Sequence, residues 1–471
     1  MNGCNHLHFS WAEVEIGDVA EVKGGKRLPK GKSLLEIPTA HPYIRVTDFD
    51  YGSVDISNLK YLDEVTHDAI KNYTISKDDL YISIAGTIGL VGEIPVELDG
   101  ANLTENAAKL CGLSGIEKSY LRYVLSSNAS KEQFDDSTTS SGQPKLALFR
   151  IKNCRFPLPP LAEQKVIADK LDTLLAQVET TKARLDRIPK ILKTFRQSVL
   201  AAAVSGKLTE EWREKNDASA WQQKILGDVV TGISQGWSPK CLSEGTSDTS
   251  WGVIKTSSVQ EIQFLEQENK KLPDNLEPRE ALKVEVGDIL TTRAGPRSRC
   301  GVTCYVENLS LNLMICDKVY RYKAKTEIGH SKFLVMQLNS HPTLENIESL
   351  KTGISESGMN LTQKKFKALP LKWPSKEEQT QIVHRVEELF AFADRIEQKA
   401  NAALDRVNSL TQSILAKAFR GELTADWRAQ NPDLISGENS AEAFLEKIKA
   451  EREALSSKKK PKKKIAARKK A

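Results

Sequence analysis

The chain has 471 residues, of which 39% are hydrophobic and 28% are charged, a composition typical of a globular protein of several domains rather than a disordered or fibrous chain. No stretch approaches the roughly 18 consecutive apolar residues of a membrane span, the N-terminal residues do not resemble a signal peptide, and seven scattered cysteines do not suggest a disulfide framework, so we expect a reducing cytoplasm. The net charge of +6 comes from residues 458–471, which hold eight lysines and one arginine and no acid, and it therefore says little about the partners of the folded part.

The first predicted domain spans residues 1–158. Its apolar segments are short and β-branched and are separated by Gly, Pro and Asn, which predicts mixed strands and short helices. A basic loop surrounds Gly24-Gly25 and Pro29; Arg and Lys on such loops suit phosphate contacts and bidentate reading of guanine, and Gln143 suits reading of adenine. A solvated surface loop is an equally good interpretation for any single residue. The candidate DNA contacts are Lys23, Lys26, Arg27, Lys30, Lys32, Arg45, Gln143 and Lys145.

A long helical region is predicted for residues 159–215. Apolar residues recur alternately every four and three positions, the heptad seam of long paired helices. Pro189 lies within this pattern and should interrupt the helix, and Gly206 stands where helices commonly end in a left-handed residue. The predicted interface residues are Ile167, Leu171, Leu174, Val178, Leu185, Leu192, Phe195 and Trp212.

The second predicted domain, residues 216–373, repeats the first only weakly. Matched segments such as Ala85-Gly86 and Ala294-Gly295 indicate that the two domains share a fold but contact different partners. Residues 1–157 hold 17 basic and 21 acidic residues and residues 217–373 hold 20 and 18, so positive charge for DNA binding must be segregated to one face. The candidate DNA contacts here are Lys255, Arg293, Arg297, Arg299, Asn360, Lys364 and Lys365.

A second helical region, residues 374–430, repeats the first at a constant offset of 215 residues. Fourteen of the fifty positions of 378–427 are identical to those of 163–212, where average residue usage gives only about three. Ser375 with Glu378 three residues later predicts a capping box, and Gly421 should end the helix as Gly206 does. The predicted interface residues are Ile382, Val386, Leu389, Val407, Leu410, Ile414 and Trp427.

The two matched seams are each other's simplest partners, and two-fold closure of a duplicated chain would set the helices antiparallel. The alternative is that each seam is only the apolar face of a helix buried within its own domain. Residues 428–457 are predicted to form a short polar helix. The last predicted region, residues 431–471, combines this helix with a lysine-rich tail that we expect to be disordered because its charges repel one another.

Catalytic and metal-binding patterns were sought and are not recognisable. Gly31-Lys32-Ser33 lacks the earlier glycine of a phosphate-binding loop, and Leu158-Pro159-Pro160-Leu161 lacks the polar and aromatic partners of an adenine methyltransferase motif. Cys300 and Cys304 are expected to share one face of a strand, but without a second Cys or His pair a zinc site is improbable. A binding protein without bound metal or cofactor is the better interpretation.

The order of variable domain, long helix, second variable domain and matched second helix resembles the specificity subunit of type I restriction–modification enzymes. The segment from Lys170-Leu171-Asp172-Thr173-Leu174-Leu175 to Gly206-Lys207-Leu208-Thr209-Glu210-Glu211-Trp212-Arg213 is similar to the type IA branch. The resemblance covers about residues 10–430 and leaves the lysine tail outside.

This resemblance implies an α+β fold in which two mixed α/β target-recognition domains alternate with two long helices paired as an antiparallel coiled coil. It implies a non-catalytic subunit whose domains each read one half of an asymmetric bipartite site in double-stranded DNA. The helices would set the spacer and hold two methyltransferase subunits and two motor–nuclease subunits, which would use S-adenosylmethionine, ATP and magnesium. The alternative function is a coiled-coil scaffold whose variable domains bind protein partners.

Overall fold

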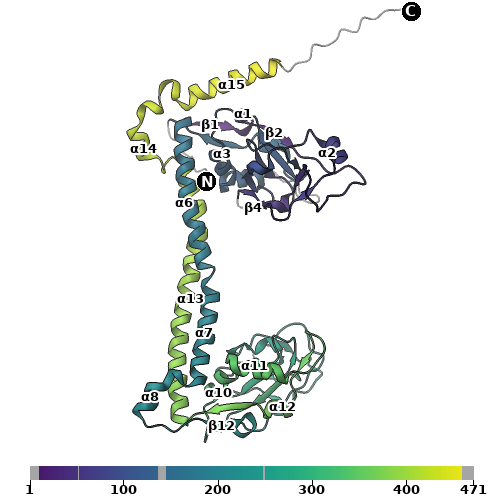
Figure 1. The fold of residues 1–471 in the computed structure, drawn as a ribbon, viewed down its shortest axis with the longest axis vertical. Helices are drawn as coiled ribbons and strands as arrows, with labels where there is room; N and C mark the ends of the chain where they lie inside the picture. Colours follow the sequence, from purple (N-terminus) through teal and green to yellow (C-terminus); the bar gives the residue numbers. More distant parts are fainter. Residues whose placement is uncertain (1–9, 51, 136–144, 248–249, 459–471) are drawn as a thin grey trace, which may run out of the picture. The chain divides into compact units, whose positions relative to one another are not determined.

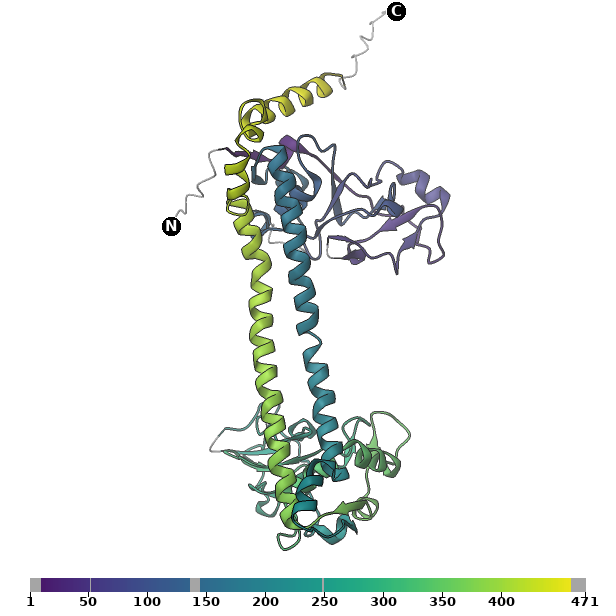
Figure 2. The same ribbon diagram turned by 60° about the vertical axis from the view of Figure 1, so that its left-hand side comes forward.

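The computed structural model describes residues 10–50, 52–135, 145–247 and 250–458 (Figures 1 and 2). Gln143 and the lysine tail from residue 459 onward lie outside the described residues. The chain divides into two compact units: unit 1 comprises residues 1–184 and 404–471, and unit 2 comprises residues 185–403. Within the described ranges, no helix is long and apolar enough to cross a membrane.

Unit 1 is built on an antiparallel four-stranded sheet in the order β2-β10-β7-β8. One of its two central strands, β7, is buried on both faces: Leu80 and Ile82 pack into the larger core, and Tyr81 between them packs into a second core. The strands are β1 (Ala12–Glu15), β2 (Glu21–Gly24), β3 (Pro42–Ile44), β4 (Phe49–Asp50), β5 (Ser53–Val54), β6 (Lys60–Tyr61), β7 (Leu80–Ser83), β8 (Val91–Glu93), β9 (Asn102–Leu103), β10 (Ala107–Cys111) and β11 (Arg155–Leu158). The helices are α1 (Ile16–Val19), α2 (Glu64–Ile70), α3 (Lys118–Ser126), α4 (Asn128–Asp135), α5 (Leu148–Lys152), α6 (Leu161–Leu185), α14 (Ala425–Gln430) and α15 (Ala441–Lys458).

Unit 2 is built on a five-stranded sheet in the order β13-β21-β17-β19-β15. Its central strand β17 is also buried on both faces, with Ile289 in one core and Leu290 in another. The strands are β12 (Gln222–Ile225), β13 (Ser234–Gln235), β14 (Trp251–Ile254), β15 (Ile262–Gln263), β16 (Asn269–Lys271), β17 (Ile289–Thr292), β18 (Ala294–Gly295), β19 (Thr303–Tyr305), β20 (Asn312–Met314), β21 (Val319–Tyr322), β22 (Met359–Asn360) and β23 (Pro370–Trp373). The helices are α7 (Ile188–Ser205), α8 (Glu210–Lys215), α9 (Leu226–Val229), α10 (Ser331–Leu338), α11 (His341–Leu350) and α12 (Gln363–Lys367), with α13 (Lys376–Phe419) continuing into unit 1.

The two units share one strand framework. A parallel pair, β3–β9 in unit 1 and β14–β20 in unit 2, occupies the same place in each topology. A terminal antiparallel ribbon, β1–β11 or β12–β23, brings the beginning and end of each domain together. The register also matches, because Ala85 pairs with Lys145 as Ala294 pairs with Asn360. The predicted common fold of the two variable segments is thus confirmed.

The two helical regions differ at the predicted proline. Helix α6 ends at Leu185 and α7 begins at Ile188, with Pro189 in the first turn of the new helix, where its missing N–H leaves no hydrogen bond unmade. Helix α13 runs without interruption from Lys376 to Phe419. Gly206 and Gly421 adopt φ values of +79° and +77° at the ends of α7 and α13, as predicted.

In each unit, α13 pairs antiparallel with a helix of the first repeat (Figures 1 and 2). In unit 2, Arg196 of α7 donates to Asp394 and Glu397 at 2.7 Å, and Arg385, earlier in α13, donates to the carbonyl of Leu208, beyond the end of α7. In unit 1, α6 lies beside the C-terminal part of α13. The predicted antiparallel pairing is confirmed.

Most predicted seam residues are buried or half-buried, but one is not. Leu410 is 43% exposed, whereas Leu415 is 1% exposed and belongs to the core of unit 1. A straight α-helix turns about 20° away from a strict heptad repeat with each seven residues, so the contact stripe moves from Val407 toward Leu415 and Ala418. The other predicted seam residues are buried or half-buried: Ile167, Leu171, Leu174, Val178, Leu185, Leu192, Phe195, Trp212, Ile382, Val386, Leu389, Val407, Ile414 and Trp427.

The segment predicted as a short polar helix forms two helices, and the second is not polar on all sides. Helix α14 ends at Gln430, before Pro432, and α15 begins at Ala441. On α15, Phe444, Leu445 and Ile448 pack against the core of unit 1. These residues are spaced by one and three positions, which places them on one face of a helix, and the abundance of lysine and glutamate around them hid this stripe from the sequence analysis.

Candidate nucleic-acid interface

A buried polar cluster fixes the base of each variable domain to the helices. In unit 1, one carboxylate oxygen of Glu163 accepts from the indole N–H of Trp11 at 2.9 Å, and the other accepts from Thr424 at 2.6 Å and from Arg428 at 2.5 Å. Arg428 also donates to the carbonyl of Gly421. The start of the domain, the start of α6 and the end of the second repeat therefore meet at one carboxylate, and we call this set the unit 1 cluster.

The unit 2 cluster repeats this arrangement. Glu378 accepts from Trp221 at 3.0 Å, from Thr209 at 2.7 Å and from Arg213 at 2.6 Å. The predicted capping box at Ser375 is therefore only half correct: the Ser375 hydroxyl accepts from the Glu378 N–H at 3.2 Å, but the Glu378 carboxylate serves the cluster instead. Sequence reasoning missed the roles of both glutamates, although their identity at an offset of 215 was visible.

The glutamine that follows each of these two glutamates attaches its helix to the body of the domain. Gln164 accepts from the backbone N–H of Glu117 at 2.8 Å, and Gln379 accepts from that of His330 at 2.8 Å. Both glutamines are fully buried. The Glu-Gln pair that opens each repeat therefore has a structural role, and the candidate DNA contacts lie elsewhere.

In the first predicted domain (domain 1), the backbone at Gly25 passes close to the backbone at the end of β9. This brings several of the candidate DNA contacts together. Gly25 lies so close to the carbonyls of Leu103 and Thr104 that a Cβ would overlap them. The next residues then pass over the end of β9, where Arg27 donates to the Glu105 carboxylate at 2.8 Å. A pocket of about 390 Å³ opens here, lined by Arg27, Leu28, Leu34, Tyr43, Arg45, Val46, Thr47, Thr104, Glu105 and Asn106.

We call the surface formed by Arg27, Arg45, Glu105 and Lys145 beside this pocket edge 1. Carboxylate and carbonyl groups orient its cations. Burial raises the pKa of Glu105, but its hydrogen bonds with Arg27, with the backbone and with Thr104, together with the charge of Arg27, outweigh burial, and the net shift is downward. Arg45 donates to Asp48 and to the Asn58 carbonyl at 3.0 Å. Lys145 reaches the Glu105 carbonyl at 3.5 Å. The structure thus gathers Arg27, Arg45 and Lys145.

The other candidates of domain 1 are distributed around edge 1. Lys23 on β2 pairs with Glu21 at 2.5 Å, and Lys32 pairs with Asp63 at 3.3 Å. Lys26 lies over the ring of Tyr73, with 5.3 Å from Nζ to the centroid. Lys30 is exposed.

In domain 2, the same framework carries different side chains. A Cβ on Gly236 would overlap the carbonyls of Ile315 and Cys316, and Ser238 donates to the Asp317 carboxylate, in the place of Arg27 and Glu105. Arg293 donates to Asn360 Oδ1 at 3.0 Å and to the Asp317 carbonyl at 3.0 Å. We call the surface formed by Ser238, Arg293, Asp317 and Asn360 edge 2.

Two other arginines of domain 2, Arg299 and Arg297, bind groups of the protein itself. Arg299 donates to the carbonyls of Thr256 and Val259 at 2.8 and 2.7 Å and to Gln260, so it supports the turn that follows Lys255. Lys255 lies 3.6 Å from Glu268. The candidates Lys364 and Lys365 are exposed on α12.

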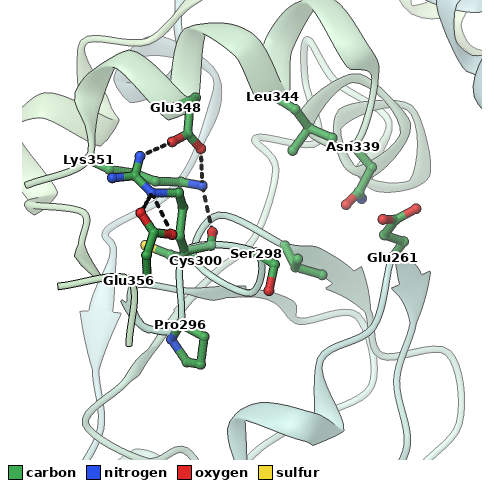
Figure 3. A pocket seen from close by; sticks show the side chains of 11 residues that line it. Glu261, Pro296, Ser298, Cys300, Asn339, Leu344, Glu348, Lys351 and Glu356 are labelled. Atoms are coloured by element: carbon green, nitrogen blue, oxygen red, sulfur yellow. Dashed lines mark hydrogen bonds and ion pairs between the residues drawn. The ribbon is translucent and has the colours of Figure 1, made fainter. Parts of the chain in front are cut away.

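A pocket of about 550 Å³ in unit 2, drawn in Figure 3, is lined in part by Arg297. The Arg297 guanidinium pairs with Glu348 and, at 2.9 Å, with Glu356. Lys351 donates to Glu348 at 2.5 Å and to the Arg297 carbonyl at 2.8 Å. Since two cations here meet three carboxylates, including that of Glu261, the pocket does not suit a phosphate, and Arg297 supports the protein's own loops.

The described cysteines form no metal centre or disulfide. Cys300, Cys304 and Cys316 are free and buried, and burial raises the pKa of Cys316 to about 11. Within the described part of the chain, no group of three or more His, Cys, Asp or Glu side chains is placed to hold a metal ion.

Comparison with known proteins matches both halves of the chain to one family. The model of the family described as "Type I restriction modification DNA specificity domain" matches residues 10–190 and again residues 218–406. The chain is 37% identical to the type I restriction enzyme EcoKI specificity subunit of Escherichia coli K12, with 97% of this chain and 99% of that protein covered. It is 36% identical to the StySPI specificity subunit of Salmonella potsdam, with the same coverage.

Solved structures share the fold. A chain from a study titled "Structural basis underlying complex assembly and conformational transition of the type I R-M system" superposes with a TM-score of 0.65 at 17% identity, covering 88% of this chain and 99% of that one. The HsdS subunit of Thermoanaerobacter tengcongensis superposes with a TM-score of 0.56 at 19% identity, covering 89% and 99%.

Proposed function

Because this chain belongs to the type I restriction–modification DNA specificity family, we propose that its two recognition domains each read one half of an asymmetric bipartite site in double-stranded DNA. The observation that supports this best is the pair of matched edges. Both are built on a close-approach glycine and on the same strand pairing, Ala85 with Lys145 and Ala294 with Asn360. One framework with different side chains suits two readers of different sequences.

The side chains at each edge favour particular base contacts. At edge 1, Arg27 and Lys145 present cationic donors, which pair with the O6 and N7 acceptors of guanine or with phosphates. At edge 2, Asn360 carries the amide that suits adenine N6 and N7, and the hydrogen bond from Arg293 orients it. Each edge is therefore expected to read its own bases.

The long helices are proposed to set the unread spacer and to hold partner subunits. A helix rises about 1.5 Å per residue, so a continuous segment such as α13 can act as a ruler between two reading domains. The chain itself is proposed to be non-catalytic and to bind no cofactor. Two methyltransferase subunits would bring S-adenosylmethionine, and two motor–nuclease subunits would use ATP and magnesium.

The test is to express this chain with its methyltransferase subunit and to map N6-methyladenine across the host DNA. We expect methylation at one asymmetric bipartite sequence, which disappears when this chain is omitted. Replacing residues 1–157 with the equivalent domain of a relative should change one half of the site and leave the other intact. Methylation that does not depend on this chain, or a change in both halves, would contradict the proposal.

Two further measurements separate DNA reading from a scaffold role. Binding to a duplex carrying the mapped site should weaken steeply with salt, because neutralised phosphates release counterions on binding. Inserting one helical turn into both α6 and α13 should lengthen the spacer without changing the bases read. An insertion that altered a half-site sequence would show that the helices do not act as a ruler.

A further inference from the structure

A short hairpin beside edge 2 exposes one large apolar side chain. The hairpin, residues 351–358, joins α11 to β22. Ile354 at its tip has a relative exposure of 108%, the highest among the large hydrophobic residues of the described part of the chain. Single exposed apolar residues are common on protein surfaces, so exposure alone assigns no role to Ile354.

Ionic contacts connect the hairpin to Arg297 and to α11. The Arg297 guanidinium donates to both Glu356 oxygens at 2.9 and 3.1 Å, and the Arg297 N–H donates to the Glu356 carbonyl at 2.8 Å. Lys351, at the start of the hairpin, is only 7% exposed and pairs with Glu348. Because Arg297 pairs with Glu356, the negative charge of the hairpin is compensated.

The backbone of the hairpin is fixed as well. Thr352 and Asn360 exchange backbone hydrogen bonds of 2.8 and 2.7 Å, and a turn is closed by a bond of 3.1 Å from Gly358 to Ser355. Gly353, at φ +137°, adopts a conformation that other residues rarely take. These bonds restrict the backbone of the tip, which lowers the conformational entropy that binding there would cost.

We propose that Ile354 enters the major groove of DNA and packs against the C5-methyl group of a thymine in the half-site read by domain 2. This rests on the proposed function. The root of the hairpin is Asn360, the residue of edge 2 best suited to adenine, so the tip lies one hairpin length from a base-reading amide. The thymine methyl is the apolar group among the base edges of the major groove, and contact between it and Ile354 removes apolar surface of both from water.

The experiment uses the complex of this chain with its methyltransferase subunits and a duplex carrying the methylated site mapped above. Each thymine of the domain 2 half-site is replaced singly by uracil, which lacks only the methyl group. Ile354→Ala should weaken binding about tenfold, and uracil at one position should weaken binding by the unmodified complex about threefold, as expected for one buried methyl. The Ile354→Ala complex should be insensitive to uracil at that position.

Two variants serve as controls. Ile354→Leu should retain most of the affinity because it keeps the apolar contact, and Val286→Ala, which shortens another exposed apolar side chain of unit 2, should not change it. Unchanged binding by Ile354→Ala, lost affinity without sensitivity to uracil at any thymine, or failure of this variant to assemble with the methyltransferase would each overturn the proposal. Failure of the unmodified complex to prefer the mapped duplex would instead refute the proposed function.

Discussion

The two recognition domains share one strand framework and carry different side chains on it. At one matched position, Arg27 faces Glu105 in domain 1 and Ser238 faces Asp317 in domain 2. At another, Lys145 is replaced by Asn360 in the same strand pairing. The comparison shows that backbone approach and register are fixed by glycines and buried strands, so that surface side chains can change without loss of the fold.

The clusters at the bases of the domains differ less, and they allow the strongest test of the comparison. Glu163→Ala leaves the Arg428 guanidinium, 7% exposed, without its carboxylate, and breaking a buried ion pair costs about 3–5 kcal/mol of unfolding free energy. Glu378→Ala should cost less, about 2 kcal/mol, because Arg213 is 24% exposed and water can replace the carboxylate. Denaturant unfolding of both variants measures the difference.

Arg428→Ala and Arg213→Ala are the reciprocal controls, since each leaves its glutamate buried with fewer donors. Equal losses for Glu163→Ala and Glu378→Ala would show that the two clusters are energetically equivalent despite their different exposure.

The next largest effect is expected at the position where the two helical regions differ by a proline. Leu404 in α13 is the counterpart of Pro189 in the first turn of α7. Leu404→Pro should destabilise the protein by about 3 kcal/mol or more, because proline inside a helix removes a hydrogen bond and clashes with the preceding turn. Pro189→Leu should change stability by less than about 1 kcal/mol, because proline in the first turn loses no hydrogen bond. Thermal unfolding followed by circular dichroism tests both, and a large effect of Pro189→Leu would mean that the helix break carries strain.

A smaller effect should distinguish the two edges. Asn360→Ala should cost about 1–3 kcal/mol of discrimination at one base pair of the half-site that domain 2 is proposed to read, and Lys145→Ala should act only on the other half-site. Competition binding with duplexes mutated in either half measures this. Lys365→Ala is the control: a phosphate contact there would weaken binding to all sequences alike and reduce the salt slope by about one.

Long-range periodicity made much of the fold predictable. The repeat offset of 215 and the heptad seam gave the paired helices, and Pro189, Gly206 and Gly421 gave their breaks and ends because backbone constraints are local. Leu410 is 43% exposed, unlike the other predicted seam residues, because a strict heptad ignores the drift of a straight helix. The apolar face of α15 was missed because lysine and glutamate are abundant around Phe444, Leu445 and Ile448.

The site was harder to predict than the fold. Basic residues on Gly-rich loops were visible in the sequence, but the acids that pair with them are distant in the chain: Glu356 lies 59 positions from Arg297, and Glu105 lies 78 from Arg27. Whether a cation is available to DNA depends on such long-range partners. The same distance concealed the roles of Glu163 and Glu378, whose partners come from another repeat.

The smallest expected effect concerns two carboxylates, Glu348 and Glu105, whose contributions to stability should both be independent of pH in the neutral range. The hydrogen bond from Lys351, followed by that from Arg297, holds the pKa of Glu348 below its ordinary value of 4.5, and the pKa of Glu105 is also lowered. A carboxylate with a depressed pKa contributes stability that is present above its ordinary pKa and lost only as the pH falls through the lower folded value. Glu348→Gln should therefore differ from the unmodified protein by a constant amount between pH 5.5 and 8.5, at most about 1 kcal/mol because the pair is partly exposed, and the difference should shrink below about pH 4.5. Glu105→Gln should behave in the same way, and a pH-dependent difference in the neutral range for one variant alone would show that edge 1 and the Arg297 pocket are stabilised differently.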